Sequence, residues 1–517
     1  MSTPPRADFI VVGAGGAGAI LAARLTEDPR VHVVLVEAGP DYPDFNRLPD
    51  ELKFGYASAS YVTTHGHLWD YMGQANSAQG LAPVPRGKVT GGTTAVNGQV
   101  FLRGLPSDFG DWVRKGNDQW SFNAMLPAFK RIETDLDFPD EWHGTDGPLA
   151  IHRYRRDEWL EPQAAFVQAC MTMGYEEAPD ANNPAARGVS PIPFNNVGGI
   201  RASTALAYLG PARGRPNLTI LAETVARRIR FDGGRAVGVE VSGPGGAAEI
   251  SGTEVICCGG SIGSPHLLLL SGVGPADQLS ALGVKPVVDL PGVGKHLQDH
   301  LVVDMLWFTT ARYGIPPADS ARVQVALRYT ASGSPFEDDM QITPRTHPPQ
   351  PRSGGGERFS VVSLVPTIER PVGSGEVRLR SGDPDVVPHI DFRFLDEAED
   401  LRRLHEGARM CLELAGDGAF GSLLADRLAP AADEIASRSD FEQWLRRSVR
   451  TSHHHCGSCK MGPGSDPTAV VDQSGRVHGV EHLRVVDASI FPEVVRANTA
   501  ATTMAVAERM AAQIAGR

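Results

Sequence analysis

The sequence predicts an α/β chain, α+β overall, in which a Rossmann-like dinucleotide-binding domain is combined with a region of antiparallel sheet. Two observations carry this prediction. The segment from Asp8 to Glu37 reads as a strand, a glycine turn, a helix and a second strand. From Leu301 to Phe394, short β-rich runs follow one another with turn residues between them and little helix, as in an antiparallel sheet: DMLWFTT, RFSVVSLVPTIE, GEVRLRS and PHIDFRF. We expect that sheet to form the floor of a second domain.

The composition is that of an ordinary folded protein. Its 517 residues suffice for roughly three domain-sized units, and we expect two large cores. The net charge of −12 argues against a nucleic-acid-binding surface, because phosphate binding needs clustered Lys and Arg. Six cysteines are too few for a disulfide scaffold and favour a reducing, cytoplasmic setting.

The N-terminal apolar run leads directly into the glycine motif, so it is predicted to be a strand and not a signal sequence. The sequence also has no apolar run of about 18 residues that would predict a transmembrane segment. Peripheral membrane contact stays open.

The glycine turn of the first unit has the spacing of a dinucleotide-binding loop. Gly13 and Gly15 let the turn tighten and the backbone approach a pyrophosphate, while Gly18 lets the helix pack closely on the strand. Glu37 ends the second strand 24 residues after Gly13, near the spacing at which a carboxylate accepts hydrogen bonds from ribose hydroxyls. An acid there favours a free ribose over a 2′-phosphate, but the motif does not choose between NAD and FAD.

Further elements follow from local periodicity and turn residues. A β-meander with a return strand to the dinucleotide sheet is predicted from NLTIL, RRIRFD, AVGVEVSG and EVICCGG. Helices are predicted over AEDLRRLHEGARMCLELAG, SDFEQWLRRSVR and TTMAVAERMAAQIAG. The Pro/Gly-rich segments PPQPRSGGGER and VSGPGGAAE are predicted to be loops.

Four separated segments together resemble one family. They are GAGGAG at Gly13 to Gly18, RGKVTGGTTAVNG at Arg86 to Gly98, GGSIGSPHLLLLSGVG at Gly259 to Gly274, and HHCGSCKMG at His454 to Gly462. In content and order they resemble the glucose-methanol-choline (GMC) oxidoreductases over essentially the whole chain. The resemblance implies FAD, bound by a discontinuous domain of residues 1–155, 196–300 and 450–517. It also implies an inserted substrate-binding domain of residues 156–195 and 301–449.

The resemblance also implies which residues contact the cofactor. VVDASIFP, from Val485 to Pro492, resembles the late FAD-binding segment, although such a run is also an ordinary strand leading to a turn. Val96 stands where several choline oxidases carry a histidine bonded to the flavin, so we expect FAD to be held without a covalent bond. The implied cofactor-binding residues are Gly13, Gly15, Gly18, Glu37, Ala38, Trp69, Arg86, Val89, Gly92, Asn97, Gly98, Val225, His453, Asp487, Ala488, Asn498 and Thr499.

His454 and Asn498 are the implied catalytic residues. Removing a hydride from an alcohol carbon also requires loss of the hydroxyl proton, and a histidine near neutral pH is a competent acceptor. His454 opens a segment that resembles the family's H-x-x-G-T/S-C-x-M-G pattern. Asn498 lies 44 positions later, just before the last helix, where it would hydrogen-bond the substrate oxygen. As a residue type, Asn498 also suits a simple helix N-cap.

Nearby residues allow other interpretations. The histidines and cysteines of His453 to Cys459 lie too close in sequence to form a tetrahedral metal site, so no metal is expected. Cys456 and Cys459 have the spacing of a redox pair but lack its βαβ context, and buried core thiols are favoured, as for the Cys257–Cys258 pair. His300 lies in GVGKHLQDH, which resembles a family stretch near the cofactor, and is interpreted as a structural histidine. Arg103 with Asp108 is interpreted as an ion-paired turn below the flavin.

The implied activity is oxidation of the CH–OH group of a small-molecule alcohol to an aldehyde or ketone, with hydride transfer to flavin N5. The external electron acceptor is O2 or a quinone-like carrier. Alternatives are a hydroxynitrile lyase-type flavoprotein of the same fold and a non-catalytic flavin-binding protein. GLPSDF, IETDLDF and HGTDGP also resemble segments of the mycofactocin-associated dehydrogenase. The alcohol and the oligomeric state are not predicted.

Overall fold

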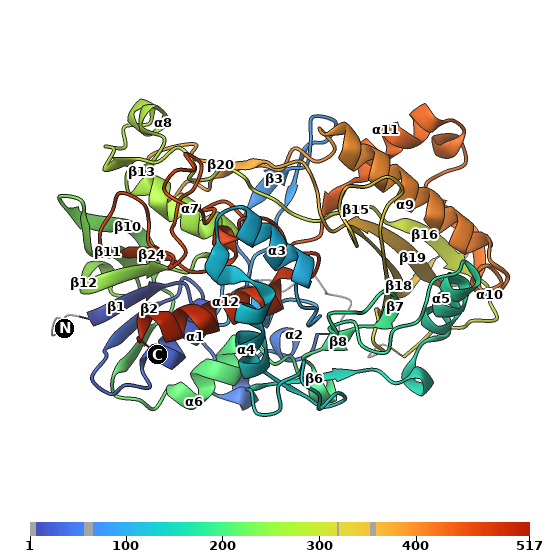
Figure 1. Cartoon of the computed structure of the whole chain (residues 1–517), viewed down its shortest axis with the longest axis horizontal. Helices are drawn as coiled ribbons and strands as arrows, with labels where there is room; N and C mark the ends of the chain where they lie inside the picture. Colours follow the sequence, from blue (N-terminus) through green and yellow to red (C-terminus); the bar gives the residue numbers. More distant parts are fainter. Residues whose placement is uncertain (1–6, 56–65, 318–319, 352–357, 517) are drawn as a thin grey trace.

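The computed structural model describes residues 7–55, 66–317, 320–351 and 358–516. Figure 1 shows two lobes side by side along the long axis. One lobe contains a seven-stranded sheet and both ends of the described chain, and the other contains an eight-stranded sheet with helices on its outer side. The predicted combination of a Rossmann-like unit with an antiparallel sheet is confirmed.

The N-terminal unit folds as the sequence predicts. Strand β1 (Ala7–Val12), helix α1 (Gly18–Leu25) and strand β2 (Val33–Val36) form a parallel βαβ unit. β2 is buried along its whole length, as parallel strands with both faces covered are.

The predicted meander lies beside this unit. Strands β10 (Val225–Asp232), β11 (Arg235–Gly243) and β12 (Gly246–Cys257) are antiparallel, and the second half of β12 pairs in parallel with β1. The sheet order is β10-β11-β12-β1-β2-β9, with β9 (Leu218–Leu221) at one edge and β24 (Leu483–Val485) paired to β12. The predicted loop VSGPGGAAE is a tight hairpin instead, because only two residues separate β11 from β12.

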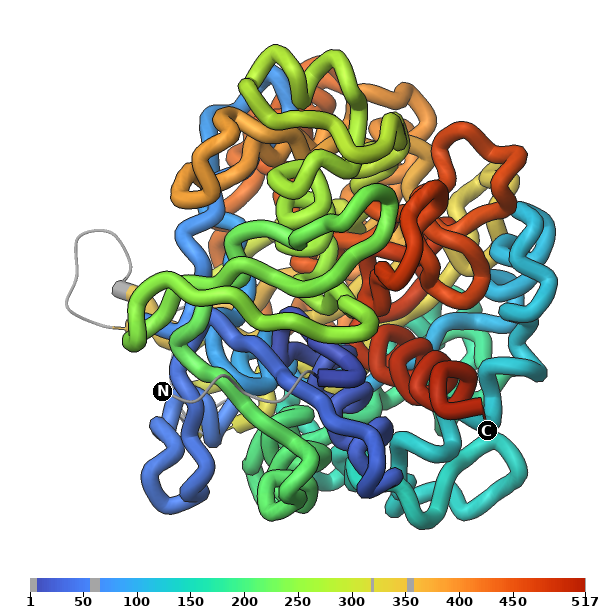
Figure 2. Tube along the Cα trace, turned by 90° about the vertical axis from the view of Figure 1, so that its left-hand side faces the viewer, coloured from blue at the N-terminus to red at the C-terminus, as the bar shows by residue number. Residues whose placement is uncertain are grey.

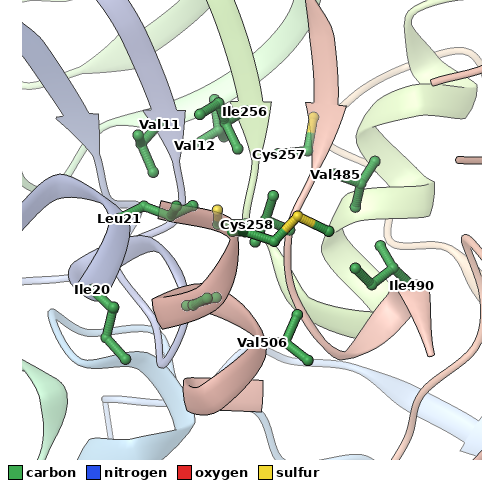
Figure 3. Close-up of a cluster of buried hydrophobic side chains, with 14 of the residues drawn as sticks. Val11, Val12, Ile20, Leu21, Ile256, Cys257, Cys258, Val485, Ile490 and Val506 are labelled. Atoms are coloured by element: carbon green, nitrogen blue, oxygen red, sulfur yellow. The ribbon is translucent and has the colours of Figure 1, made fainter. Parts of the chain in front are cut away.

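The core of this lobe joins segments from both ends of the chain. Figure 3 shows Val11 and Val12 of β1, Ile20 and Leu21 of α1, and Val506 of α12 (Thr499–Ile514) among the buried side chains of this cluster. In Figure 2, which looks onto this lobe, the C-terminal helix lies beside the N-terminal strands. The last helix therefore completes the core that the first βαβ unit begins.

The second lobe is built on antiparallel strands. Its sheet has the order β22-β16-β19-β18-β17-β7, with β15 and β23 attached off this path. The strands are β7 (Gly188–Pro191), β15 (Leu301–Val302), β16 (Met305–Thr309), β17 (Val325–Tyr329), β18 (Met340–Pro351), β19 (Arg358–Ile368), β22 (Leu424–Ala429) and β23 (Arg450–Thr451).

Three predicted features differ in this lobe. β17 and β18 were not predicted, and the first residues of PPQPRSGGGER extend β18, while residues 352–357 lie outside the described part. The predicted strands GEVRLRS and PHIDFRF form β20 (Glu376–Arg378) and β21 (His389–Asp391). They join a separate four-stranded sheet with β3 (Met72–Gln74) and β4 (Leu81–Pro83).

The predicted helices are present. They are α9 (Ala398–Gly416), α11 (Arg438–Ser448) and α12, and α9 packs with α5 (Glu161–Thr172) against the outer face of the eight-stranded sheet. None of the helices in the described ranges is both long and apolar enough to cross a membrane.

The remaining elements are short. The helices are α2 (Asp50–Lys53), α3 (Pro106–Arg114), α4 (Phe122–Ile132), α6 (Gly210–Ala212), α7 (Gly260–Leu270), α8 (Ala276–Ala281) and α10 (Gly418–Gly421). The strands are β5 (Glu133–Asp135), β6 (Leu149–Arg153), β8 (Pro193–Phe194), β13 (Val273–Gly274) and β14 (Val288–Asp289).

Candidate active site

A cavity of about 520 Å³ opens at the carboxyl ends of β1, β2 and β12. Parallel α/β sheets bind ligands at this edge, where backbone amides and helix N-termini converge. The cavity runs from Val225 near one end of the meander to His454 and Asn498 in the C-terminal part of the chain. It has the size range of cofactor and small-molecule pockets.

The glycines of the loop allow close backbone contacts beside the cavity. Gly13 has φ +103°, and a Cβ there would lie 2.5 Å from the carbonyl oxygen of Cys258. A Cβ on Gly18 would lie 1.9 Å from the carbonyl oxygen of Gly13, so this glycine permits the contact between α1 and the loop. Gly92 has φ +52° and approaches Gly15 from the other side. Two bare backbone segments thus form one wall of the cavity, which fits a pyrophosphate.

Glu37 lies at the end of β2 as predicted. Its carboxylate accepts backbone N–H bonds from Ala14 and Gly39, each at 2.9 Å. Burial raises the pKa of Glu37 to about 7. The carboxylate lines the cavity and also ties the glycine loop to the following turn.

The structure brings nearly all predicted cofactor residues to this one cavity. Gly18 and Val89 do not line it: Gly18 acts through helix packing, and Val89 packs with Leu52 and Ala95 in a small cluster. Val96 lines the cavity with an aliphatic side chain. The predicted residues on its wall are Gly13, Gly15, Glu37, Ala38, Trp69, Arg86, Gly92, Asn97, Gly98, Val225, His453, His454, Asp487, Ala488, Asn498 and Thr499.

An ionised carboxylate that was not predicted holds the histidine segment in place. Asp299 Oδ1 accepts the backbone N–H of His454 at 2.8 Å, and Oδ2 lies 3.2 Å from His455 Nε2 and hydrogen-bonds Thr451. The neighbouring imidazoles and hydroxyl hold the pKa of Asp299 well below its usual range. The segment GVGKHLQDH, which contains Asp299, carried the only sequence signal for this role.

His453 has a strained backbone that turns the segment toward the cavity. Its φ is +67°, a left-handed value that costs energy for a residue with a side chain. Arg86 Nη2 donates to the carbonyl of His453 at 2.5 Å. The His453 Nδ1 is buried and has no hydrogen-bond partner in the described part of the chain. A buried polar atom without a partner on a cavity wall is suited to meet a bound polar group.

His454 lies between two polar side chains. Its Nε2 is 2.8 Å from Asn498 Nδ2, and its Nδ1 is 2.9 Å from His300 Nδ1. The side chain of Asn498 makes no capping bond to α12, so the simple N-cap interpretation of this residue does not hold. Burial lowers the pKa of His454 well below its usual value, with the neighbouring His300 as a further cause.

These contacts define where the protons are. The amide nitrogen of Asn498 is a donor, so His454 Nε2 is the unprotonated nitrogen and His454 Nδ1 carries the hydrogen. His300 Nε2 donates to the carbonyl of Val495 at 2.9 Å, which leaves His300 Nδ1 to accept from His454 Nδ1. The basic lone pair of His454 is thereby fixed on Nε2, the nitrogen at Asn498.

His300 is therefore more than the structural histidine that was expected. It is fully buried, and its ring lies edge-on to that of His454 with centroids 4.9 Å apart. On its other side, Glu369 Oε2 lies 3.1 Å from His300 Nδ1. That oxygen is buried and has no hydrogen-bond donor among the residues that the structure describes. Burial raises the pKa of Glu369, and His300 opposes that rise.

The expected ion pair between Arg103 and Asp108 is wrong. Arg103 pairs with Glu133, and Asp108 pairs with Arg496 at 2.6 Å, so the two side chains belong to different networks. Sequence proximity suggested a local pair, but each side chain finds a partner from another element.

All six cysteines are buried and free. Burial raises the pKa of the Cys456 and Cys459 thiols well above the usual value, which disfavours thiolate redox chemistry. The preferred interpretation of these residues as core thiols fits this environment.

The fold and the site define a Rossmann-like dinucleotide-binding protein with a buried His/Asn pair on the wall of its cofactor cavity. The chain belongs to the GMC oxidoreductase family. Residues 7–302 match the N-terminal region of the GMC oxidoreductases, and residues 371–507 match the C-terminal region. FAD is the cofactor of this family, and the glycine cradle fits its pyrophosphate.

The names of similar proteins refer to different substrates. An uncharacterised GMC-type oxidoreductase of Rhodococcus erythropolis is 35% identical over 100% of both chains. An oxygen-dependent choline dehydrogenase of Brucella canis is 34% identical over 99% of this chain and 96% of that protein. The crystal structure of pyridoxine 4-oxidase from Mesorbium loti has a TM-score of 0.90 and 31% identity over 99% of this chain and 100% of the other.

Proposed function

We propose that this protein oxidises the CH–OH group of a small-molecule alcohol to an aldehyde or ketone, with His454 as the base. The observation that supports it is the 2.8 Å contact between His454 Nε2 and Asn498 Nδ2 on the wall of the cofactor cavity. The relatives named as choline dehydrogenase and pyridoxine 4-oxidase also act on molecules that contain an alcohol, which supports the same reaction class.

His454 and Asn498 would hold the substrate oxygen between them. A bound hydroxyl would displace the direct hydrogen bond between Asn498 and His454: its O–H would donate to His454 Nε2, and the amide N–H of Asn498 would donate to its oxygen. Because His454 is buried with a lowered pKa, its Nε2 is unprotonated at neutral pH and ready to accept. Non-covalently bound FAD supplies the acceptor for the hydride. Reoxidation then needs an external acceptor, either O2 or a quinone-like carrier.

His300 and Glu369 would stabilise the proton after it leaves the substrate. When His454 gains a proton at Nε2, the hydrogen on its Nδ1 moves toward His300 Nδ1, 2.9 Å away. His300 then carries a positive charge, and its single Nδ1–H is shared between His454 Nδ1 and Glu369 Oε2, which has no donor among the described residues before the reaction. The charge thus moves away from the cavity toward a buried carboxylate.

The other predicted residues act on the cofactor in this proposal. Asp299 fixes the backbone of His454, and Arg86 fixes that of His453. Glu37 and the glycine loop hold the nucleotide end. The division into an FAD-binding part (1–155, 196–300, 450–517) and a substrate-binding part (156–195, 301–449) is part of the proposal. The pairing of β7 with β17 supports it, because that contact brings the two substrate-binding segments together.

The test is anaerobic mixing of the purified protein with a panel of primary and secondary alcohols while the visible absorbance of the flavin is followed. We expect bleaching with at least one alcohol and its loss in His454→Ala. Admitting air afterwards separates an oxidase from a dehydrogenase. Bound, dithionite-reducible FAD that no alcohol bleaches would contradict the proposal, and cyanide release from mandelonitrile would then indicate the lyase reaction.

A further inference from the structure

One face of the eight-stranded sheet is turned toward the cofactor cavity. Leu327 of β17 packs in the hydrophobic core beneath α5 and α9. Its neighbour Ala326 points to the opposite face and belongs to a cluster with Val100, which lines the cavity. Glu369, the residue after β19, approaches His300 behind the proposed base. This inner face therefore borders the active site.

Arg328 lies on the same face as Ala326. Its side chain is buried, with 7% of the residue exposed. Within the described ranges the side chain of Arg328 makes no hydrogen bond or ion pair, and its Nε is a buried donor without an acceptor. Burial lowers the pKa of Arg328, but a guanidinium stays charged at neutral pH. The protein thus carries an unpaired positive charge beside its active site. A buried charge of this kind is costly unless a group of opposite charge pairs with it.

The neighbouring carboxylates do not form an ion pair with Arg328. Three carboxylates whose negative charge acts on Arg328 form no ion pair with it in the described part of the chain. Asp338 pairs with Arg187 at 3.3 Å and Asp108 pairs with Arg496 at 2.6 Å, while Glu369 Oε2 faces His300 Nδ1 at 3.1 Å.

The surroundings of Arg328 are polar and include a small hollow. Arg328 pairs across the strands with Gln341, which in turn pairs with Thr367, so three polar residues form one row on this face. The hydroxyl of Thr343, two residues along β18, is also buried and has no hydrogen-bond partner within the ranges that the structure describes. A cavity of about 10 Å³ lies against Arg328 and Gln341, which is room for one water. Leu102 closes this cavity from the segment that carries Val100.

We propose that Arg328 binds a carboxylate on the substrate, so that the substrate class is alcohols that also carry an anionic group. This inference rests on the proposed alcohol oxidation and names the substrate class of that same site. A carboxylate accepts two parallel N–H bonds from a guanidinium and would supply the missing charge. It would take the place of the water that the small cavity admits.

The arrangement also sets a rough length for the substrate. β17 and β19 are separated by one strand, so Arg328 starts about 10 Å across the sheet from the strand that leads to Glu369. The carboxylate and the reacting carbon should therefore be several bonds apart, as in 4-(hydroxymethyl)benzoate. A quaternary ammonium alcohol such as choline would meet the unpaired charge of Arg328 and be disfavoured.

The first test compares matched substrates. We expect 4-(hydroxymethyl)benzoate to reduce the flavin with at least 10-fold higher kcat/KM than its neutral amide, and choline to be the poorest of the three. Arg328→Met should remove the preference for the carboxylate and leave kcat/KM for the amide within about threefold of the wild-type value. Arg230→Met is the matched control, because it removes an arginine paired with Glu249 on the surface of the other sheet. Equal use of the acid and amide by the wild type would overturn the inference.

A second measurement needs no turnover. Benzoate and benzamide are titrated into the oxidised holoenzyme, and the flavin difference spectrum gives each dissociation constant. We expect Arg328→Met to weaken benzoate at least 10-fold and to leave benzamide unchanged, with Arg328→Gln behaving alike. Arg328-dependent benzoate binding without alcohol oxidation would reject the proposed function alone. Alcohol oxidation without any dependence on the carboxylate or on Arg328 would reject the anion site alone.

Discussion

Replacing Glu369 by glutamine removes a buried negative charge next to His300 and keeps the size of the side chain. In the proposed reaction Glu369 Oε2, 3.1 Å from His300 Nδ1, gains a hydrogen bond only when the His300–His454 pair takes up the substrate proton. A hydrogen bond to a charged group contributes about 1.5–3 kcal/mol. A loss of about 2 kcal/mol from the transition state slows flavin reduction roughly 30-fold.

The assay is anaerobic stopped-flow reduction across pH, which separates the limiting rate from the dissociation constant of the alcohol. We expect the limiting rate to fall. The dissociation constant of the alcohol should remain unchanged, because Glu369 is not on the cavity wall. The carboxylate raises the proton affinity of the histidine pair. Its removal should therefore move the acid limb of the rate profile to lower pH.

Glu493→Gln is the matched control. Glu493 is also a buried carboxylate, on the loop that leads to Asn498, but it pairs with Arg370 and Lys115. It should alter stability without moving the acid limb. The reasoning would be refuted if Glu369→Gln reduced the flavin at the wild-type rate, or if both variants slowed equally with unchanged pH profiles.

Three further predictions concern other parts of the molecule. Asn498→Ala should lower the limiting rate of flavin reduction by about 10²-fold, the usual loss for one oxygen-stabilising donor, measured in the same stopped-flow assay. Gly18→Ala should destabilise the fold by about 1–3 kcal/mol and release FAD, because its Cβ would overlap the Gly13 carbonyl. Urea unfolding and retained flavin are measured beside Gly110→Ala, whose Cβ would make only an ordinary contact with Arg114 Nη1 at 3.5 Å. Against the effect of burial, Asp135, Asp180 and Glu133 raise the pKa of His143 to about 10. The contribution of His143 to stability is therefore complete below about pH 6.5 and is lost as the pH rises toward 10. Thermal unfolding of His143→Gln should lack that decline, and an equal decline in both proteins would contradict the assignment.

Local patterns were sufficient where an element's own periodicity determines it. The predicted helix AEDLRRLHEGARMCLELAG is α9 residue for residue, because its buried positions recur at helical spacing. β18 was missed for the opposite reason. It contains prolines, which normally argue against an interior strand, yet it lies between β17 and β19. Its strand conformation is imposed by its neighbours in the sheet.

The active site likewise contains residues that local motifs predict and residues that only long-range contacts reveal. The residues that match family segments, such as His454 and Asn498, were predicted, and the structure brings them within 2.8 Å of each other. The contact of His300 with His454 joins positions 154 residues apart, and Glu369 lies in no motif. No local pattern in a single sequence encodes such a contact, so the roles of these two residues became visible only once the strands were assembled.

Two charged side chains on the inner face of the eight-stranded sheet have unsatisfied atoms that support one interpretation. Among the residues that the structure describes, Glu369 Oε2 is an acceptor without a donor, and Arg328 Nε is a donor without an acceptor. The charge of each acts on the pKa of the other, yet no ion pair joins them and Glu369 faces His300 instead. Folding alone would favour a direct pair, since each orphan costs free energy. Keeping them apart is useful if each is completed during the reaction, Glu369 by the substrate proton and Arg328 by the substrate anion. A double variant that exchanges the two charges, Arg328→Glu with Glu369→Arg, should therefore fold but lose both flavin reduction and benzoate binding, whereas retained activity would show that neither charge has a role in the reaction.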